Sequence, residues 1–394
     1  MPIFNYKDPH VTPIIIASLF IVIARKPLGR RGNLSRSSRH CVPQDDGGFL
    51  LTMTADFSPL YESPLDLFLD KKYSCLMEKH HIGIVGHGAW GSALAKCAYE
   101  AGHLVTAWSR QHTTAASGYQ LTQSLTDLAP CDILIVAIPS AALKDVLSDM
   151  QAAALAPPLL INATKGLEQS TGHLLSTLYQ EAFPEAARGV LSGPNLAHEI
   201  SAGLSAASSL YCPAAFWPKL KTLFNPHSLR LYHCTDEIGI QIGGALKNII
   251  AIATGYCHGA KLGKNMEALV MTRGLHEMVR LGVRLGAQVS TFSGLSGMGD
   301  TILTCSSLQS RNFRFGMMLS EGSTVSEALQ QIGTVEGVST ASSLTKLLNQ
   351  HPVDLPICQA VIQLIQNEKK PADLIQMLLA RPLKKETDHD TLPL

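Results

Sequence analysis

The sequence predicts an α/β domain followed by an all-α domain, and three observations lead to this fold class. The segment 81–95 has the pattern of a short apolar strand, a glycine-rich turn and the start of an Ala- and Leu-rich helix. Apolar strand-like runs then alternate with helical patterns as far as about residue 234, which is typical of a parallel sheet. From 235 to about 379 the pattern is helical, with few strand-like runs.

The glycine-rich turn has the spacing G-x-G-x-x-G, formed by Gly86, Gly88 and Gly91. The first glycine permits a tight turn off the strand, the second lets the backbone approach a pyrophosphate, and the third lets helix and strand pack closely. The helix N-terminus offers free N–H groups and a positive dipole end to the phosphates. An ordinary glycine-rich turn can share this spacing. Together with the alternation that follows, however, it predicts a Rossmann-type dinucleotide-binding domain.

The second strand, predicted within 102–110, ends in Ser109 and Arg110, where an acidic residue would bind the ribose hydroxyl of NAD. A hydroxyl and a guanidinium suit a 2′-phosphate, which a carboxylate would repel. We therefore expect NADP(H) to be preferred over NAD(H). A solvated surface arginine is the alternative interpretation of Arg110.

Further strands are predicted along the first domain. The run 131–140 is almost continuously apolar and stops at a proline, the pattern of a parallel strand buried on both faces. A helix is predicted within 143–150, and strands within 159–164 and 189–192. Each strand is followed by a turn or a polar group, and open α/β sheets bind ligands at the carboxyl ends of their strands.

The helical domain opens at Thr235, where Asp236 and Glu237 supply a helix cap and an acidic first turn. Lys247 is a single charge among the glycines and aliphatic residues of this helix. Burying such a lysine is costly unless its pKa falls or a partner meets it. Both conditions suit a lysine that exchanges protons near neutral pH. A lysine that reaches to the surface is the alternative interpretation.

Composition limits the remaining functions. The chain has 394 residues, enough for two domains, and its net charge of +1 offers no electrostatic footprint for nucleic acid. Its nine cysteines include no C-x-x-C pair and no nearby histidine at ligand spacing. We therefore expect free thiols in a reducing, cytoplasmic location, with no disulfide framework and no metal site.

Residues 1–76 are not predicted to belong to either domain. The apolar run 12–24 is shorter than the roughly 20 residues that span a bilayer, and its positive charges follow it, the reverse of a secretory signal. The segment 25–75 is rich in Ser, Arg, Gly, Pro and Asp, which favours disorder. We expect a disordered or non-native extension without stable membrane insertion. A targeting segment and a membrane-associating segment are the alternatives.

The two domains together carry eight short motifs. In chain order they are Gly86-x-Gly88-x-x-Gly91, Thr164-Lys165-Gly166-Leu167, Ser192-Gly193-Pro194, Gly243-Gly244-Ala245-Leu246-Lys247-Asn248, Thr272-Arg273-Gly274-Leu275, Gly294-Leu295-Ser296-Gly297-Met298-Gly299-Asp300, Leu303-Thr304-Cys305 with Ser310-Arg311-Asn312, and Val335-Glu336-Gly337. In this order the chain resembles the NAD(P)-dependent glycerol-3-phosphate dehydrogenases, in their bacterial biosynthetic form, over about residues 80–385.

The resemblance implies reduction of dihydroxyacetone phosphate to sn-glycerol 3-phosphate for glycerophospholipid synthesis, with NADP or NAD as cofactor. The preference for NADP rests on Ser109 and Arg110. It assigns 77–234 to a Rossmann NAD(P)-binding domain, 235–385 to a helical substrate and catalytic domain, and 386–394 to a flexible tail. A small-molecule substrate is the expected partner, and a homodimer stays open. A related two-domain dehydrogenase acting on hydroxyisobutyrate or phosphogluconate and a catalytically silent NADP-binding sensor are the alternative functions.

The resemblance also implies site residues. Lys247 accepts the proton of the C2 hydroxyl, or donates it to the carbonyl in reverse, and Asp300 orients Lys247. Without the resemblance, a loop-capping aspartate would be the simpler interpretation of Asp300. The implied substrate-binding residues are Lys165, Gly193, Asn195, Lys247, Asp300, Ser310, Arg311 and Asn312. The implied cofactor-binding residues are Gly86, Gly88, Ala89, Trp90, Gly91, Arg110, Lys165, Ala197, Arg311, Val335 and Glu336.

Three positions depart from the usual pattern of that family. Asn195 stands where Ser or Thr is common, Ala89 replaces a frequent Ser or Asn, and His87 occupies a position usually held by Ala. The first change alters one substrate hydrogen bond, and the second removes a side-chain contact to the pyrophosphate. None of the three removes a catalytic group, so an active enzyme is expected.

A chain beginning at Met77 is expected to fold and to keep most of the activity of the full chain, because the ordered motifs begin only after His81. Expression of both forms, followed by a comparison of soluble yield and specific activity, measures this. Loss of soluble, active protein on truncation would show that residues 1–76 contribute to the folded enzyme.

Overall fold

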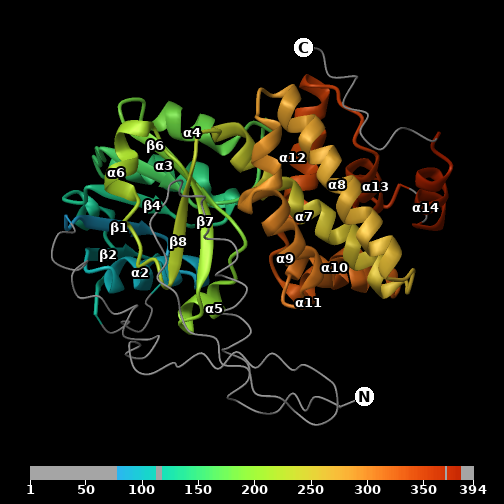
Figure 1. Cartoon of the computed structure of the whole chain (residues 1–394), viewed down its shortest axis with the longest axis horizontal. Helices are drawn as coiled ribbons and strands as arrows, with labels where there is room; N and C mark the ends of the chain where they lie inside the picture. Colours follow the sequence, from blue (N-terminus) through green and yellow to red (C-terminus); the bar gives the residue numbers. More distant parts are fainter. Residues whose placement is uncertain (1–77, 112–117, 369–370, 383–394) are drawn as a thin grey trace, which may run out of the picture. The chain divides into compact units, whose positions relative to one another are not determined.

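The computed structural model describes residues 78–111, 118–368 and 371–382, which all belong to one compact unit. The extension 1–76 and the tail 386–394, both predicted above, lie outside the described residues. Within the described part, a largely parallel sheet with its helices is followed by a helical domain (Figure 1). This arrangement confirms the predicted fold class.

Eight strands of the described chain form one sheet in the order β3-β2-β1-β4-β5-β6-β7-β8. The strands are β1 (His81–Val85), β2 (Leu104–Trp108), β3 (Gln120–Thr122), β4 (Ile133–Val136), β5 (Leu159–Asn162), β6 (Ala187–Ser192), β7 (Ala206–Tyr211) and β8 (Leu229–Cys234). Pairing is parallel from β3 to β6, antiparallel between β6 and β7, and parallel between β7 and β8. From β1 the next strands in sequence are added on one side, to β3, and from β4 they are added on the other side. Sheets of this type bind ligands at this change of direction, which here lies beside the glycine-rich turn.

The sheet is covered on both faces. Its helices are α2 (Ala89–Glu100), α3 (Leu143–Ala152), α4 (Leu175–Ala182), α5 (Ala197–Ser201) and α6 (Trp217–Leu220). Along β4, Ile133 and Ile135 join the hydrophobic cluster that contains α2, α5 and α6 residues, whereas Leu134 and Val136 join the cluster of α3 and α4. Because successive side chains point to opposite faces, a strand buried on both faces is apolar throughout, as the sequence predicted.

Three strands were not predicted, for a reason visible in their sequences. β7 contains two serines and alternates between buried and half-buried positions, and β8 mixes Arg and His with its leucines. β3 is only three residues long and lies at the edge of the sheet. Such strands lack both the continuous apolar run and the strict alternation on which the prediction depends.

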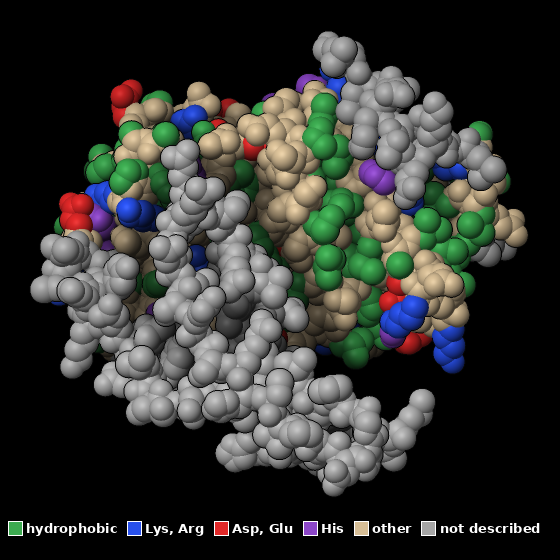
Figure 2. All heavy atoms as spheres, viewed as in Figure 1, with side chains coloured by type: hydrophobic (Ala, Val, Ile, Leu, Met, Phe, Trp, Pro, Cys, Tyr) green, Lys and Arg blue, Asp and Glu red, His purple; other side chains and the backbone are tan. Residues whose placement is uncertain are grey.

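The helical domain is built around one central helix. Its helices are α7 (Glu237–Gly259), α8 (Lys264–Arg284), α9 (Asp300–Ser306), α10 (Arg311–Ser320), α11 (Val325–Ile332), α12 (Glu336–Gln350), α13 (Pro356–Ile365) and α14 (Pro371–Leu379). Helices α8, α9, α10, α12 and α13 all pack against α7 (Figure 1). Space-filling spheres show hydrophobic side chains reaching the surface over this helical half (Figure 2).

The central helix begins as predicted, because the Asp236 carboxylate accepts a hydrogen bond from the Gly239 N–H at 2.8 Å. A Cβ on Gly255 would lie 2.0 Å from the Phe313 carbonyl oxygen, so this glycine lets the backbones of α7 and α10 touch. Among the described helices, α7 is long and apolar enough to span a bilayer. However, 89% of its apolar 18-residue stretch is buried inside the protein. Its apolar composition is that of a core helix.

One buried carboxylate fastens α13 to α8. Glu277 is 1% exposed, and its two oxygens accept hydrogen bonds from the backbone N–H groups of Ile357 at 2.7 Å and Cys358 at 3.0 Å. Burial raises the pKa of Glu277 to about 7, although both hydrogen bonds favour the ionised form. The side chain therefore replaces the acceptors that the first turn of α13 lacks.

Replacing Glu277 with alanine is expected to lower the free energy of unfolding by about 2–4 kcal/mol, because two buried N–H groups lose their acceptor. Urea unfolding of the wild type and of Glu277→Ala measures the difference. Glu321→Ala, at an exposed position after α10, is the control and should change stability by no more than about 0.5 kcal/mol. Equal effects of the two changes would contradict this role of Glu277.

Candidate functional site

A buried carboxylate joined to two lysines lies where the sheet meets the helical domain. Asp300, at the start of α9, is 1% exposed. Its Oδ1 accepts a hydrogen bond from Lys247 Nζ at 2.5 Å, and its Oδ2 accepts one from Lys165 Nζ at 2.6 Å. Lys165 follows β5, whereas Lys247 lies in the middle of α7. The structure therefore brings together three residues that the sequence places far apart.

Lys247 is almost fully buried and hydrogen-bonded, and one side of it faces a cavity. Its side chain is 9% exposed, and Nζ also donates a hydrogen bond to Thr304 Oγ1 at 3.0 Å. Burial lowers the pKa of Lys247 to about 8, against the opposing attraction of Asp300. Both conditions expected for a buried lysine, a partner and a lowered pKa, are present. The alternative of a lysine that reaches the surface does not describe this structure.

A cavity of about 140 Å³ opens beside this group. Its lining residues are Asn195, Leu196, Lys247, Asn248, Asp300, Leu303, Thr304, Ser310, Arg311, Asn312 and Glu336. Lys165 and Gly193 are not in the lining, and Lys165 Nζ donates a hydrogen bond of 3.1 Å to the Gly193 carbonyl. The lining is mostly polar and carries charges of both signs, so the cavity suits a small polar molecule rather than an apolar one.

One wall of the cavity is the N-terminus of α10. Ser310 caps this helix, and its Oγ accepts a hydrogen bond from the Phe313 N–H at 3.2 Å. Arg311 is the first residue of the helix and is exposed, and the first turn contains no acidic residue. A guanidinium beside a helix N-terminus is a favourable place for an anion such as a phosphate.

Two asparagines predicted to bind substrate have side chains that form hydrogen bonds within the protein. Asn195 Nδ2 donates to the carbonyls of Pro194 and Ala207, both at 3.1 Å, and its Oδ1 accepts from Ser208 Oγ at 2.6 Å. These bonds use both amide hydrogens, so the side chain fixes the turn after β6 against β7. Asn195 also lines the cavity, and its Oδ1 retains a second acceptor lone pair, so the predicted contact with substrate stays a prediction.

Asn312 belongs to a chain of hydrogen bonds between three helices. Its Nδ2 donates to Asn248 Oδ1 at 2.9 Å, and its Oδ1 accepts from the Gly337 N–H at 2.8 Å. Asn248 Nδ2 in turn donates to Glu336 Oε2 at 3.2 Å. The chain of bonds joins α7, α10 and α12 at the edge of the cavity.

Four residues of the cavity lining were not among the predicted site residues: the polar Asn248 and Thr304, and the apolar Leu196 and Leu303. Asn248 directly follows Lys247 in α7. Thr304 lies four residues after Asp300, so Asp300 and Thr304 share one face of α9. Asn248 and Thr304 belong to motifs quoted above, and the helical spacing from Asp300 was the signal that could have identified Thr304.

The glycine-rich turn has the geometry that the sequence predicted. Gly86 has φ +102°, and a Cβ on Gly91 would lie 1.8 Å from the Gly86 carbonyl oxygen. A Cβ on Gly88 would meet nothing within 4 Å, so the backbone there is open to an approaching ligand. No acidic residue stands in the first turn of α2. The turn therefore fits the pyrophosphate of a dinucleotide.

The other residues predicted to bind the cofactor lie on or next to α2, β2, α5 and α12. The Trp90 indole Nε1 is buried and has no hydrogen-bond partner among the described residues, so it is a donor that a ligand could use. Arg110 is exposed just after β2. Ala197 begins α5, Val335 is the buried N-cap of α12, and Glu336 is the first residue of α12.

His87, inside the glycine-rich turn, contacts another ring. Its Nε2 lies 2.8 Å from the Tyr119 hydroxyl, and the two rings meet edge to face with centroids 5.8 Å apart. Burial lowers the pKa of His87, which favours the neutral ring. In this geometry the histidine holds the turn against the start of β3.

Comparison with known proteins assigns the chain to a family. The family model of the NAD-dependent glycerol-3-phosphate dehydrogenase C-terminus matches residues 236–376, and that of the N-terminus matches 81–127 and 119–215. The chain is 41% identical to glycerol-3-phosphate dehydrogenase [NAD(P)+] of Acaryochloris marina over 308 residues, which cover 77% of this chain and 97% of the relative. It is equally identical, over 315 residues, to the protein of that name from Trichormus variabilis, covering 79% and 99%.

Solved structures give the same result. The crystal structure of glycerol-3-phosphate dehydrogenase from Coxiella burnetii superposes with a TM-score of 0.73 at 33% identity, covering 77% of this chain and 99% of that one. The structure of the glycerol-3-phosphate dehydrogenase from Saccharomyces cerevisiae, at 23% identity and a TM-score of 0.68, shares the fold over 76% of this chain and 99% of that one. The resemblance inferred from the eight motifs is thereby confirmed, and the chain belongs to the NAD-dependent glycerol-3-phosphate dehydrogenase family.

Proposed function

We propose that this chain is an NAD(P)H-dependent oxidoreductase that reduces dihydroxyacetone phosphate to sn-glycerol 3-phosphate and also catalyses the reverse reaction. The observation that carries the proposal is the buried Lys247–Asp300–Lys165 group beside a small cavity with an arginine at its wall. The names of the relatives support the substrate and the cofactor.

Lys247 is the acid and base in this proposal. As an ammonium it donates a proton to the carbonyl oxygen at C2 during reduction, and as a neutral amine it accepts the hydroxyl proton during oxidation. A pKa of about 8 lets both forms exist near neutral pH, which is the condition for efficient general acid–base catalysis. Bound NAD(P)H supplies the hydride.

Asp300 positions the lysine and balances charge. Its carboxylate holds Lys247 Nζ at 2.5 Å while Thr304 supplies a second contact, so the ammonium is fixed in direction. Lys165, Lys247 and Arg311 outnumber the carboxylates of Asp300 and Glu336, which leaves one surplus positive charge around the cavity. That charge stabilises the negative oxygen that develops at C2 in the transition state.

Arg311, Ser310 and the N-terminus of α10 bind the substrate phosphate in this proposal. The exposed guanidinium supplies a charged fork, and the helix supplies backbone N–H groups. Gly193 and Asn195 shape the facing turn, and Asn312 holds α10 in place through Asn248. This arrangement leaves the carbonyl end of the substrate toward Lys247.

The dinucleotide would be held by the glycine-rich turn of Gly86, Gly88 and Gly91. The other proposed contacts are Ala89, Trp90, Arg110, Lys165, Ala197, Arg311, Val335 and Glu336. We assign 77–234 to the nucleotide-binding domain and 235–385 to the substrate and catalytic domain. In support, the last strand of the sheet ends at Cys234 and the first long helix begins at Glu237.

A cytoplasmic location is part of the proposal. Seven cysteines lie in the described residues and all are free thiols, which suits a reducing compartment. Whether the chain acts as a homodimer is answered by its mass in solution, measured by light scattering.

Oxidation of NADPH on adding dihydroxyacetone phosphate to the purified chain tests the proposed reaction directly. Consumption of NADPH with formation of glycerol 3-phosphate supports it. NADPH binding without turnover would instead indicate a catalytically silent sensor. Reduction of NADP+ by a hydroxyacid, without turnover of dihydroxyacetone phosphate, would indicate one of the other two-domain dehydrogenases.

Arg110→Asp is expected to weaken NADPH binding by about 1–3 kcal/mol and NADH binding much less, because only NADPH carries the 2′-phosphate that the guanidinium would pair with. Fluorescence titration with each nucleotide gives the two dissociation constants. Arg230→Asp, on β8, is a control for the general effect of charge. Equal weakening of both nucleotides by Arg110→Asp would mean that Arg110 does not bind the 2′-phosphate.

Lys247→Ala is expected to lower kcat by about 10² to 10⁴, the usual contribution of general acid–base catalysis, with little change in NADPH affinity. Lys247→Arg should fail as well, because a guanidinium cannot give up its proton at neutral pH. Lys221→Ala, at an exposed lysine, is the control and should keep wild-type kcat. An active Lys247→Ala enzyme would make Lys165 the next candidate for the acid and base.

Arg311→Ala should act mainly on kcat/KM, because it removes a phosphate contact.

The two reaction directions are expected to depend on pH in opposite ways. Reduction needs protonated Lys247, so its kcat should fall as pH rises through about 8, whereas oxidation needs the neutral amine and should accelerate over the same range. Steady-state rates measured from pH 6 to 10 with saturating substrates test this. The same trend in both directions would contradict proton transfer by Lys247.

A further inference from the structure

A second cavity lies in the helical domain, between α8, α13 and α14, and shares no lining residue with the cavity beside Lys247. Its volume is about 340 Å³, within the range of small-molecule sites. The residues that line it are Cys257, Leu262, Met266, Leu269, Val270, Arg273, Glu277, Arg280, Pro356, Ile357, Ile375, Leu378, Leu379, Arg381 and Pro382. The proposed reaction uses none of them.

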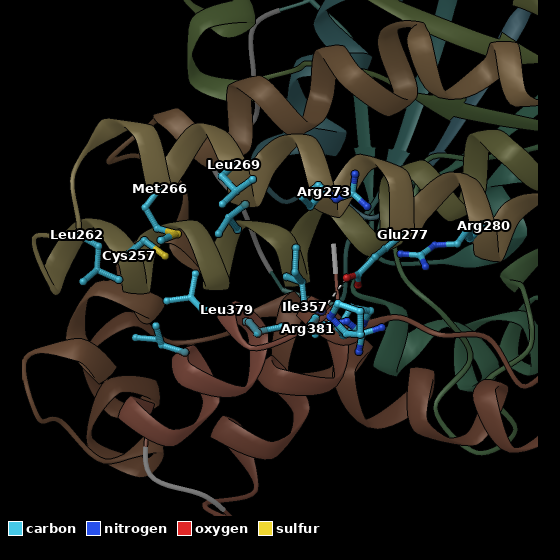
Figure 3. Close-up of a pocket in the computed structure, with 15 residues that line it drawn as sticks. Cys257, Leu262, Met266, Leu269, Arg273, Glu277, Arg280, Ile357, Leu379 and Arg381 are labelled. Carbon is cyan, nitrogen blue, oxygen red and sulfur yellow. Dashed lines mark hydrogen bonds between the residues drawn. The ribbon is translucent and has the colours of Figure 1, made fainter. Parts of the chain in front are cut away.

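The two ends of this cavity differ in chemistry (Figure 3). Leu262, Met266 and Leu269 gather at one end, and the guanidiniums of Arg280 and Arg381 lie at the other. Helix α8 produces much of this gradient. Its residues Met266, Leu269, Arg273, Glu277 and Arg280 follow one another at intervals of three or four and so share one helix face. The cavity is therefore amphipathic along its length.

The charged end carries more positive than negative charge. Arg280 and Arg381 both pair with the single carboxylate of Asp354. The oxygens of Glu277 are already engaged by the first turn of α13. Arg273 has no hydrogen bond or ion pair with any residue of the described chain. Three guanidiniums thus face two carboxylates, and the surplus positive charge has no partner among the residues that the structure describes.

The apolar end contains side chains that the protein leaves partly in water. Leu269 is 48% exposed, Leu262 is 38% exposed and Leu379 is 62% exposed. Covering such side chains is favourable by roughly 25 cal/mol for each Å² removed from water. A ligand with an apolar part would gain this energy, and an anionic part would neutralise the unpaired guanidinium at the other end.

We propose that this cavity binds a small amphiphile with one anionic head group and an apolar hydrocarbon tail, with the head beside Arg273 and the tail against Leu269. Charge complementarity selects an anion over a cation, and the aliphatic lining selects a hydrocarbon tail over a polar one. This proposal does not depend on the proposed reaction, because the cavity and its ligand lie outside the residues assigned to it.

Isothermal titration of the full chain with decanoate, below its critical micelle concentration, tests the proposal. Saturating NADPH and glycerol 3-phosphate are present, so that the carboxylate cannot bind at Arg311. One decanoate per chain is expected. Decanol, with the same tail and no charge, should bind about tenfold more weakly, and acetate, with the charge and no tail, should not bind measurably. Decanol binding as tightly as decanoate would overturn the anionic head group.

Substitutions in the cavity lining test whether decanoate binds at this site. Arg273→Gln is expected to weaken decanoate binding about tenfold, the loss of roughly one charge-assisted hydrogen bond, and Leu269→Asn should weaken it as well. Arg284→Gln, at an exposed position near the end of the same helix, is the matched control and should bind like the wild type. Arg381→Gln, outside the helices, gives a second test of the charged end should Arg273→Gln unfold. Thermal unfolding monitored by circular dichroism identifies such a failure.

Three results would overturn the proposal. The first is an absence of saturable binding by decanoate, and the second is wild-type affinity in both arginine variants. The third is a dimer in which a second copy covers the cavity, detected as a doubled mass by light scattering together with failure to bind decanoate. Preserved reduction of dihydroxyacetone phosphate in all variants would separate these outcomes from any failure of the proposed reaction.

Discussion

The hydrogen-bonded charge cluster of Asp300 with Lys247 and Lys165 is the interaction on which the rest of the site depends. A carboxylate that is 1% exposed would be very unfavourable alone, and each of its oxygens is compensated by a different ammonium. Because one lysine follows a sheet strand and the other lies in the central helix, the cluster forms only when the two parts of the chain are packed together. The same burial lowers the pKa of Lys247 into the range useful for proton transfer.

Two consecutive glycines make that packing sterically feasible. A Cβ on Gly243 would lie 2.5 Å from the carbonyl oxygen of Ser296, in the turn that leads to Asp300. A Cβ on Gly244 would lie 2.9 Å from Ser192 Oγ and 3.5 Å from Lys165 Cγ. The aspartate-bearing turn and the lysine after β5 can therefore both approach α7 within one turn of Lys247. Bulkier residues would push the members of the cluster apart.

Prediction succeeded where one local requirement decided the outcome. The glycine-rich turn was predictable because positive φ at Gly86 and close approach at Gly91 demand glycine. The start of α7 was predictable because Asp236 caps it through its own first turn. Strands β7 and β8 were missed because the sheet supplies their stability through pairing, which leaves a weak pattern in the residues themselves. The hydrogen bonds from Asn195 to Ala207 and from Ser208 to Asn195 were not predictable either, because they join segments that only the sheet brings together.

The sequence by itself determined the order of two domains, the dinucleotide turn and the chemical conflict of a lysine in an apolar helix, because each depends on residues close together in the chain. Only the tertiary structure decided which groups resolve that conflict. Asp300 lies 53 positions from Lys247 and 135 from Lys165, and no local pattern encodes contacts over such separations. The packing of α7 against α9 and the end of β5 sets those distances, and with them the pKa of Lys247 and the cavity beside it.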